Sequence, residues 1–226
     1  MPTLSILVPV YNEERTIGTV MNLLARTCPD AEVIYVDDGS KDGSLAIMKN
    51  NARPQDTVLT KENGGKGSAI RMGLSKASGT FTVIQDADTE YDPSEIALLL
   101  EEAKKSPNVA VFGSRFLREN PNIYKRYLFG NKLITGLVNI LFGSRLTDSY
   151  TCYKLFPTEL MRSFPLTARG FELEAELCAY PLMRKISIRE IPISYRPRSL
   201  EEGKKIRPAD AWKGFKTLLR IRLGRA

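Results

Sequence analysis

Short apolar runs alternate with stretches of helical spacing through the first half of the chain, and this alternation limits the folds open to it. Residues 4–10 form a continuous apolar run, as in a strand covered on both faces. Residues 15–25 then carry apolar side chains at helical spacing. The pattern continues with strands expected over 32–37, 57–60, 80–85 and 109–113, and helices over 44–50, 66–77 and 93–104. This order predicts an α/β fold with a mostly parallel sheet flanked by helices.

The second half of the chain is less regular. We expect helices over 123–142 and 171–183, a late strand over 188–194 and an amphipathic stretch over 212–223. The apolar residues of 123–142 cover too wide an arc for a simple surface helix. That segment is interpreted either as a helix at a membrane interface or as a core helix or dimer contact. The expected organisation is one domain over 1–209, with a mobile basic loop at about 195–207, and a basic amphipathic tail over 210–226.

The composition excludes several kinds of chemistry. The 226 residues include no histidine, which rules out histidine-based triads, histidine-ligated zinc and an imidazole base. The net charge of +7 favours anionic partners such as phosphates, nucleic acid or acidic lipid headgroups. The three cysteines match no metal-binding spacing and are interpreted as buried thiols in a reducing compartment. With neither a signal peptide nor a run of about 18 apolar residues, we expect a cytoplasmic protein, soluble or peripheral on a membrane.

Two carboxylates directly follow the strand expected over 80–85. Asp86 and Asp88 are one residue apart, so in a loop they can point toward a common centre. Oxygen ligands of this kind suit a hard divalent cation, Mg²⁺ or Mn²⁺, with positions left for phosphates. A solvated acidic turn is the alternative. The position after a buried strand favours the metal, because parallel sheets bind ligands at the carboxyl ends of their strands.

Two other loops have polar residues of interest. A carboxylate of Asp37-Asp-Gly-Ser40 is suited to accept hydrogen bonds from a ribose or a base, although Asp-Gly is also a common turn pair. Asn63-Gly-Gly-Lys-Gly67 precedes a helix, where backbone N–H groups and Lys66 suit phosphate. The alternative is a flexible loop at a helix start. The second segment is not a Walker A motif, because Gly67 stands where Ser or Thr is needed.

Taken together, these segments resemble glycosyltransferase family 2, the inverting enzymes with the GT-A nucleotide-sugar fold. The first four occur in the family's order: Val8–Glu14, Asp37–Ser40, Asn63–Gly67 and Gln85–Asp88. Further segments are similar to the polyprenyl- and dolichyl-phosphate sugar transferases, including the dolichyl-phosphate mannosyltransferase type: 113–115, 148–154, 170–174, 195–199 and 202–206. The resemblance implies metal-dependent transfer of mannose or glucose, from a donor such as GDP-mannose or UDP-glucose, to a polyprenyl or dolichyl phosphate at a membrane surface.

The resemblance also implies roles for single residues. The donor side would comprise Pro9, Tyr11, Glu13, Asp38, Gly65, Lys66, Asp86, Arg198 and Lys205. Asp86 and Asp88 would hold the metal. The phosphates of donor and acceptor would face arginines, namely Arg115, Arg126, Arg196 and Arg198. The catalytic set would be Asp88, Asp148, Arg115 and Arg196.

Asp148 stands where the resemblance implies a candidate base. A hydroxyl acceptor needs such a base, whereas a lipid phosphate is already ionised. With a phosphate acceptor, Asp148 is expected to position arginine and substrate instead. The basic segment from Arg196 to Arg207 is interpreted as a loop that closes over the phosphates, with a solvated basic tail as the alternative.

Other functions fit the sequence less well. One alternative within the family is transfer to a sugar hydroxyl in polysaccharide or lipid-linked oligosaccharide synthesis, for which the basic segment has no evident use. A nucleic-acid-binding module is disfavoured, because the aromatic residues do not cluster with the basic ones. A non-catalytic nucleotide-sugar binder is disfavoured by the intact Asp86 and Asp88. A separate membrane-protein partner is left open.

Overall fold

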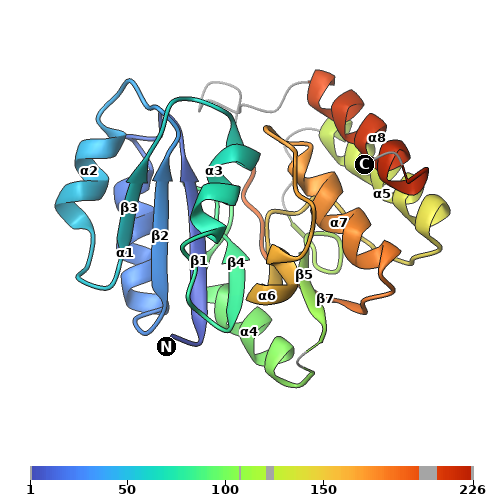
Figure 1. Cartoon of the computed structure of the whole chain (residues 1–226), viewed down its shortest axis with the longest axis horizontal. Coiled ribbons are helices and arrows are strands. Elements are labelled where there is room, and N and C mark those ends of the chain that lie inside the picture. The colour runs from blue at the N-terminus through green and yellow to red at the C-terminus, as the bar shows by residue number, and fades with distance from the viewer. Residues whose placement is uncertain (1, 107, 121–124, 199–207, 225–226) are drawn as a thin grey trace.

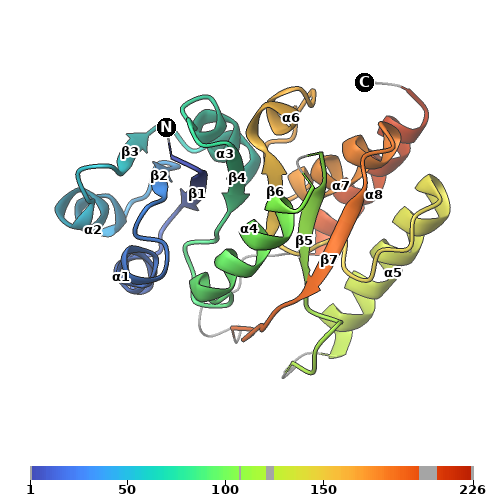
Figure 2. The same cartoon turned by 90° about the horizontal axis from the view of Figure 1, so that it is seen from below.

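The computed structural model describes residues 2–106, 108–120, 125–198 and 208–224. Within these residues one sheet of seven strands runs through the molecule, with helices on both faces (Figures 1 and 2). The strands are β1 (Leu4–Val10), β2 (Glu32–Asp37), β3 (Thr57–Thr60), β4 (Phe81–Ile84), β5 (Ala110–Ser114), β6 (Lys154–Pro157) and β7 (Ile188–Pro192). The helices are α1 (Ile17–Thr27), α2 (Ser44–Asn51), α3 (Lys66–Leu74), α4 (Ile96–Lys104), α5 (Lys125–Phe142), α6 (Thr158–Arg162), α7 (Leu173–Met183) and α8 (Pro208–Arg222).

The strands are arranged across the sheet in the order β3-β2-β1-β4-β6-β5-β7. β1 pairs in parallel with β2 and β4, β2 with β3, and β5 with β7. β6 alone among these strands is antiparallel to its neighbours, β4 and β5. The predicted α/β fold with a mostly parallel sheet is therefore confirmed.

The sequence pattern predicts neither β6 nor the short helix α6 that follows it. β6 begins at Lys154, whose side chain is fully buried. A lysine at the start of a four-residue strand does not indicate a central position in a sheet, because lysines are rarely buried without a partner. The partner is Glu174 of α7, twenty residues further along the chain, so the local pattern carries no sign of it.

The core lies between the sheet and the helices on its two faces. β1 is buried at almost every position, and α1 buries Ile17, Val20, Met21 and Leu24, which are spaced at helical intervals. The helix expected from residue 93 begins with a 3₁₀ turn over Pro93–Glu95 and continues as α4. Proline suits this first position, since it has no N–H to leave unpaired.

The C-terminal segment belongs to the body of the domain. α8 packs against α7 and α5, and its Leu218 and Ile221 are buried. The boundary expected after residue 209 therefore falls inside a packed helix. Of the loop expected over 195–207, residues 199–207 lie outside the described residues. No helix in the described part of the chain combines the length and the apolar character that a membrane crossing requires.

Candidate functional site

The carboxyl ends of the parallel strands meet at one edge of the sheet, and the acidic loops lie there. β1 and β2 are paired in register up to Val10 and Asp37. Asp38 follows β2, and Asp86 and Asp88 follow β4, the other neighbour of β1. The three carboxylates therefore start from adjacent strand ends, at the edge where open parallel sheets bind ligands.

Asp86 is paired with Lys66, the lysine of the glycine-rich loop. Nζ of Lys66 lies 2.7 Å from Oδ1 of Asp86 and 3.1 Å from Oε1 of Glu174. The other carboxylate oxygen of Glu174 accepts a hydrogen bond from Lys154, which also donates to the carbonyl of Thr151. Two lysines and two carboxylates thus alternate from β6 to the end of β4, and each buried charge has a partner of opposite sign.

Mutual attraction keeps both members of this pair charged. Burial lowers the pKa of Lys66, but the Asp86 carboxylate and its neighbours raise it well above its ordinary value. Burial likewise raises the pKa of Asp86, and Lys66 outweighs that effect and lowers it. Lys66 is therefore a fixed positive charge beside Asp86 at neutral pH.

Arg198 lies directly against Asp88. Its Nη2 is 2.6 Å from Oδ2 of Asp88, and its Nη1 is 3.1 Å from Oε2 of Glu13. The main-chain N–H of Arg198 donates to Oε1 of Glu90 at 2.7 Å, and the hydroxyl of Tyr195 donates to the other oxygen of Glu90 at 2.8 Å. The guanidinium thus lies among carboxylates that follow β1 and β4.

Asp88 has the most unusual acid–base behaviour of these carboxylates. Burial, together with repulsion from Asp86 and Glu90, raises the pKa of Asp88 to about 7 although Arg198 acts to lower it. An added positive charge would offset such repulsion. No three acidic or thiol side chains of the described residues gather as a complete metal site. Two aspartates nevertheless fit a divalent cation that takes its remaining ligands from phosphate and water.

Asp38 organises the glycine-rich loop. Its Oδ1 accepts hydrogen bonds from Nζ of Lys61 at 2.7 Å and from the N–H of Gly64 at 2.9 Å. Its Oδ2 accepts a hydrogen bond from the N–H of Gly65 at 2.7 Å. The buried Asp38 carboxylate therefore accepts three hydrogen bonds, which fix the loop relative to β2.

Some of the N–H groups around the start of α3 have partners within the protein. Two of them donate to the Asp38 carboxylate, and the N–H of Ser68 donates to the carbonyl of Arg169 at 3.1 Å. The loop is packed closely there, because a Cβ on Gly65 or Gly67 would lie 2.5 Å from a carbonyl oxygen of the segment before α7. The N–H groups of Gly64 and Gly65 are thus engaged within the protein, and Lys66 brings a positive charge to the site; phosphate binding by this loop stays a prediction.

Arg115 and Asp148 form a closed ion pair at the end of β5. Nε and Nη2 of Arg115 lie 2.7 and 2.8 Å from the two carboxylate oxygens of Asp148, and the main-chain N–H of Arg115 donates to Asp148 at 3.1 Å. Burial lowers the pKa of Arg115, but Asp148 raises it well above its ordinary value, so the guanidinium stays charged. Asp148 is fully buried, and both of its oxygens are engaged. The geometry suits positioning of Arg115 and leaves Asp148 poorly placed to take a substrate proton.

The remaining predicted site residues lie outside these ion pairs. Pro9 and Tyr11 are half-buried at the end of β1. Arg196 is exposed, and its main-chain N–H donates to the carbonyl of Glu90 at 2.9 Å. Lys205 lies outside the described residues, as does the side chain of Arg126.

Several residues that contact the candidates have no individual role in the sequence-based prediction. They include Lys61, which binds Asp38, Glu90, which binds the segment around Arg198, and the pair Lys154 and Glu174. A sign of the pair was present in α7, where Glu174 and Glu176 are the two acidic residues of a largely apolar helix. A buried acid needs a partner, and finding it requires the fold.

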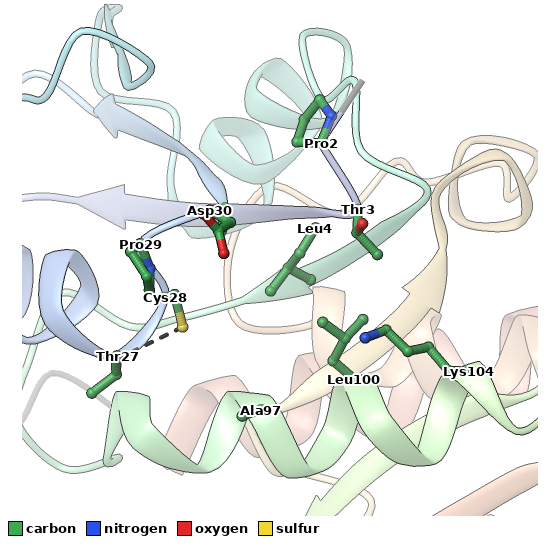
Figure 3. Close-up of a pocket in the computed structure, with 11 residues that line it drawn as sticks. Pro2, Thr3, Leu4, Thr27, Cys28, Pro29, Asp30, Ala97, Leu100 and Lys104 are labelled. Carbon is green, nitrogen blue, oxygen red and sulfur yellow. Dashed lines mark hydrogen bonds between the residues drawn. The ribbon is translucent and has the colours of Figure 1, made fainter.

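A hollow of about 410 Å³ lies at the opposite, amino edge of the sheet (Figure 3). The start of β1 and the ends of α1 and α4 line it, with Leu4, Cys28 and Leu100 among the side chains. Burial raises the pKa of the Cys28 thiol, which therefore stays protonated and unreactive. This hollow lies at the other ends of the strands from the ion pairs above and is separate from the candidate site.

A protein-family model described as glycosyl transferase family 2 matches residues 5–163 of the chain. The low-salt glycan biosynthesis hexosyltransferase Agl6 of Haloferax volcanii is 25% identical over 226 residues, which cover 96% of this chain and 53% of that protein. The UDP-N-acetylglucosamine–dolichyl-phosphate N-acetylglucosaminyltransferase of Methanococcus voltae is 29% identical, with coverage of 97% and 96%. The undecaprenyl-phosphate 4-deoxy-4-formamido-L-arabinose transferase of Aeromonas hydrophila is 28% identical, with coverage of 88% and 59%. The chain thus spans little more than half of the first and third relatives.

Solved structures of glucosyl-3-phosphoglycerate synthase from Mycobacterium tuberculosis have a similar fold. The complex with Mn²⁺, UDP and phosphoglyceric acid has a TM-score of 0.77 at 20% identity, covering 98% of this chain and 78% of that one. The complex with Mg²⁺ and UDP has a TM-score of 0.75 at 21% identity, covering 99% and 80%. The similarity establishes the fold of this chain, which is the GT-A fold expected from the sequence.

Proposed function

The chain belongs to glycosyl transferase family 2, and on that premise we propose that it transfers a hexose from a nucleotide-diphosphate sugar to a polyprenyl or dolichyl phosphate. The bond from the anomeric carbon to the donor phosphate breaks, and its electron pair leaves with the nucleoside diphosphate. An oxygen of the acceptor phosphate forms the new bond from the opposite face, so the configuration inverts. No covalent intermediate on the protein is needed, in keeping with a chain that has no histidine.

The proposal that the acceptor is a phosphate rests on the closed ion pair of Arg115 and Asp148. A hydroxyl acceptor must give its proton to a base, and Asp148, the candidate base, is fully buried with both oxygens bound to Arg115. A phosphate acceptor has no proton to lose and needs positive charge instead. Arg115, held in place by Asp148, supplies that charge. The names of the Methanococcus and Aeromonas relatives, which include a dolichyl and an undecaprenyl phosphate, support the same class.

Asp86 and Asp88 would hold a divalent cation, Mg²⁺ or Mn²⁺, together with the donor diphosphate. When bound, the cation offsets the negative charge that develops on the leaving diphosphate. Lys66 is already fixed beside Asp86 and adds to the same electrostatic effect. Arg198 would give up Asp88 and Glu13 and turn its guanidinium to the phosphates, for which its planar shape is suited.

The donor nucleotide would lie over the ends of β1 and β2. Pro9, Tyr11 and Glu13 follow or end β1 and would surround the base and ribose. Asp38 would act through the glycine-rich loop, because its carboxylate holds that loop. The Methanococcus relative is named for a UDP-sugar and the mycobacterial structures contain UDP, so a UDP-sugar is better supported than GDP-mannose.

The location follows from the two substrates. A lipid phosphate acceptor keeps the reaction at a membrane surface, and a nucleotide-sugar donor is expected on its cytoplasmic face. The chain would therefore act as a peripheral protein there, alone or with a membrane-protein partner.

A comparison of acceptors tests this proposal. Transfer from one nucleotide sugar is measured to a short polyprenyl phosphate, to the polyprenol of the same length and to a soluble oligosaccharide. We expect product with the phosphate and none with the two hydroxyl acceptors. Product with the oligosaccharide alone would favour the alternative, a family 2 transferase that glycosylates sugar hydroxyls.

A further inference from the structure

Large exposed apolar side chains gather on two helices that contact each other, α5 and α8. On α5, Phe129 is 66% exposed, Leu133 59% and Ile140 83%. On α8, Trp212 is 58% exposed, and Leu223, directly after the helix, is 64% exposed. The other three such side chains of the described residues occur singly on other elements. Single exposed apolar residues are ordinary, whereas a gathering of five indicates a contact surface.

On α5 these side chains share one face. Residues eleven positions apart lie about 20° apart around an α-helix, three turns along its axis. Phe129 and Ile140 of α5 have this spacing. Leu133 lies one turn after Phe129 on the same stripe. Figure 1 shows α5 and α8 next to each other on the flank of the molecule that carries the C-terminus.

The same two helices carry nearly all of the chain's excess positive charge. α5 contains three Lys and Arg and no acidic residue, and α8 contains four Lys and Arg against one Asp. Together the two helices have a net charge of +6, against +7 for the whole chain. Lys132, Lys216 and Arg222 are exposed on these helices. Nζ of Lys216 lies 5.3 Å from the ring centroid of Trp212, which combines aromatic and basic character at one point.

We infer that α5 and α8 form a docking surface for an anionic lipid bilayer. Helices that lie at the boundary between headgroups and acyl chains expose apolar and Trp side chains flanked by Lys and Arg. Anionic headgroups attract the basic residues, and the acyl region takes the apolar stripe. A second copy of the chain is the weaker occupant, because two faces with the same positive surplus repel each other.

Both helices also brace the segment that holds Arg115. Oγ1 of Thr135 on α5 lies 3.0 Å from Oγ of Ser149. Gly214 on α8 packs so closely on Tyr150 that a Cβ would lie 1.8 Å from its hydroxyl oxygen. Nη2 of Arg115 donates to the carbonyl of Tyr150 at 3.1 Å. A bilayer under α5 and α8 would bring a lipid phosphate close to Arg115, a consequence that rests on the proposed function.

Vesicle sedimentation tests the docking surface. The wild type is compared with the double variant Leu133→Glu plus Ile140→Glu, with Trp212→Glu, and with the control Leu98→Glu, whose side chain is 56% exposed on α4. Circular dichroism checks that each variant is folded. With vesicles of phosphatidylglycerol and phosphatidylcholine, we expect the wild type and Leu98→Glu to bind. We expect the other two variants to bind at least tenfold more weakly, as should the wild type on pure phosphatidylcholine.

Two outcomes would overturn the inference. Binding that is unchanged in the Leu133 and Ile140 double variant would remove this surface from membrane contact. The surface would instead be a contact with a second copy of the chain if the wild type does not bind vesicles, forms a dimer by light scattering, and loses that dimer in the double variant. A second assay, sugar transfer to a short, water-soluble polyprenyl phosphate without vesicles, tests the proposed function independently of the docking surface. An active wild type that does not bind vesicles refutes only the docking surface, and an inactive one that does bind refutes only the proposed function.

Discussion

Arg198 contacts Asp88 at 2.6 Å, and the same guanidinium reaches Glu13 at 3.1 Å. The residue proposed to meet the donor diphosphate therefore occupies a carboxylate proposed to hold the cation. Two positive charges cannot share that carboxylate at hydrogen-bonding distance without strong repulsion. On this proposal, cation binding and the release of Arg198 would be coupled, and the coupling would have measurable consequences.

Replacing Arg198 by Gln should separate the two roles. At a pH high enough to ionise Asp88, whose pKa rises further without Arg198, the nucleotide-free variant should bind Mn²⁺ several-fold more tightly than the wild type, because the internal competitor is gone. Its kcat should fall by about 100-fold, because a charge aimed at the leaving diphosphate is lost. Calorimetry and transfer assays measure the two effects. Arg189→Gln, which removes an exposed partner of Glu102, is the matched control and should change neither. Weaker Mn²⁺ binding with an unchanged kcat would contradict the coupling.

The raised pKa of Asp88 should make the stability of the metal-free protein depend on pH. Its pKa is about 7 in the fold against an ordinary 3.8, so the folded state keeps a proton that the unfolded chain has already released. The free energy of unfolding therefore falls as pH rises through this window. Histidine is absent from the chain, so few other side chains titrate there.

Thermal unfolding between pH 5 and 7.5 measures this effect. We expect Tm to fall with pH in the wild type and to fall less in Asp88→Asn. Added Mn²⁺ should raise Tm at pH 7.5 in the wild type far more than in the variant. Equal pH slopes in the two proteins would show that Asp88 is not the group responsible.

Asp148→Asn tests whether Asp148 positions Arg115 or acts as a base. A positioning role predicts a fall of about 10- to 100-fold in kcat/KM for the lipid phosphate, with the shape of the pH–rate profile unchanged. The asparagine keeps one oxygen for Arg115 but removes the charge of the buried pair, so Tm should fall as well. A loss of more than about 10,000-fold, together with loss of the limb of the profile assigned to a base, would point to general-base catalysis instead.

Glu174→Ala should be one of the more destabilising single substitutions in the site. It leaves the fully buried Lys154 without its carboxylate, and removing one member of a buried ion pair costs about 3–5 kcal/mol. Glu159→Ala removes the partner of Arg162 on an exposed face, where a pair contributes about 0–1 kcal/mol. Urea denaturation of the two variants gives both values. Similar values for both would mean that the buried chain of charges does not stabilise the fold.

The strands and helices with clear apolar periodicity could be predicted, and the contacts between distant segments could not. β1 is apolar throughout, and α1 repeats its apolar residues at helical intervals, so both are evident locally. β6 begins with a lysine whose burial depends on Glu174, which only the fold brings near. The same limit applies within the site. Asp88 could be placed at a strand end, but its partner Arg198 is 110 residues away in the chain.

The glycine-rich loop illustrates a second limit of prediction from sequence. The same glycine pattern can serve to bind a ligand or to allow close packing of the backbone. Gly65 precedes a helix, as in many phosphate-binding loops. In the structure its N–H donates to Asp38, and its lack of a Cβ allows close packing on the carbonyl of Arg169. Composition alone does not separate a glycine that meets a ligand from one that meets its own backbone.

The most direct measurement is product formation from a panel of nucleotide sugars and a short polyprenyl phosphate, followed by mass spectrometry with and without EDTA. The panel contains GDP-mannose, UDP-glucose and UDP-N-acetylglucosamine, and wild type and Asp88→Asn are run side by side. We predict a glycosyl-phosphate lipid from at least one donor, formed only with Mg²⁺ or Mn²⁺ and reduced at least 100-fold in Asp88→Asn. No lipid product from any donor, or equal turnover in EDTA and in the variant, would contradict metal-dependent transfer to a lipid phosphate.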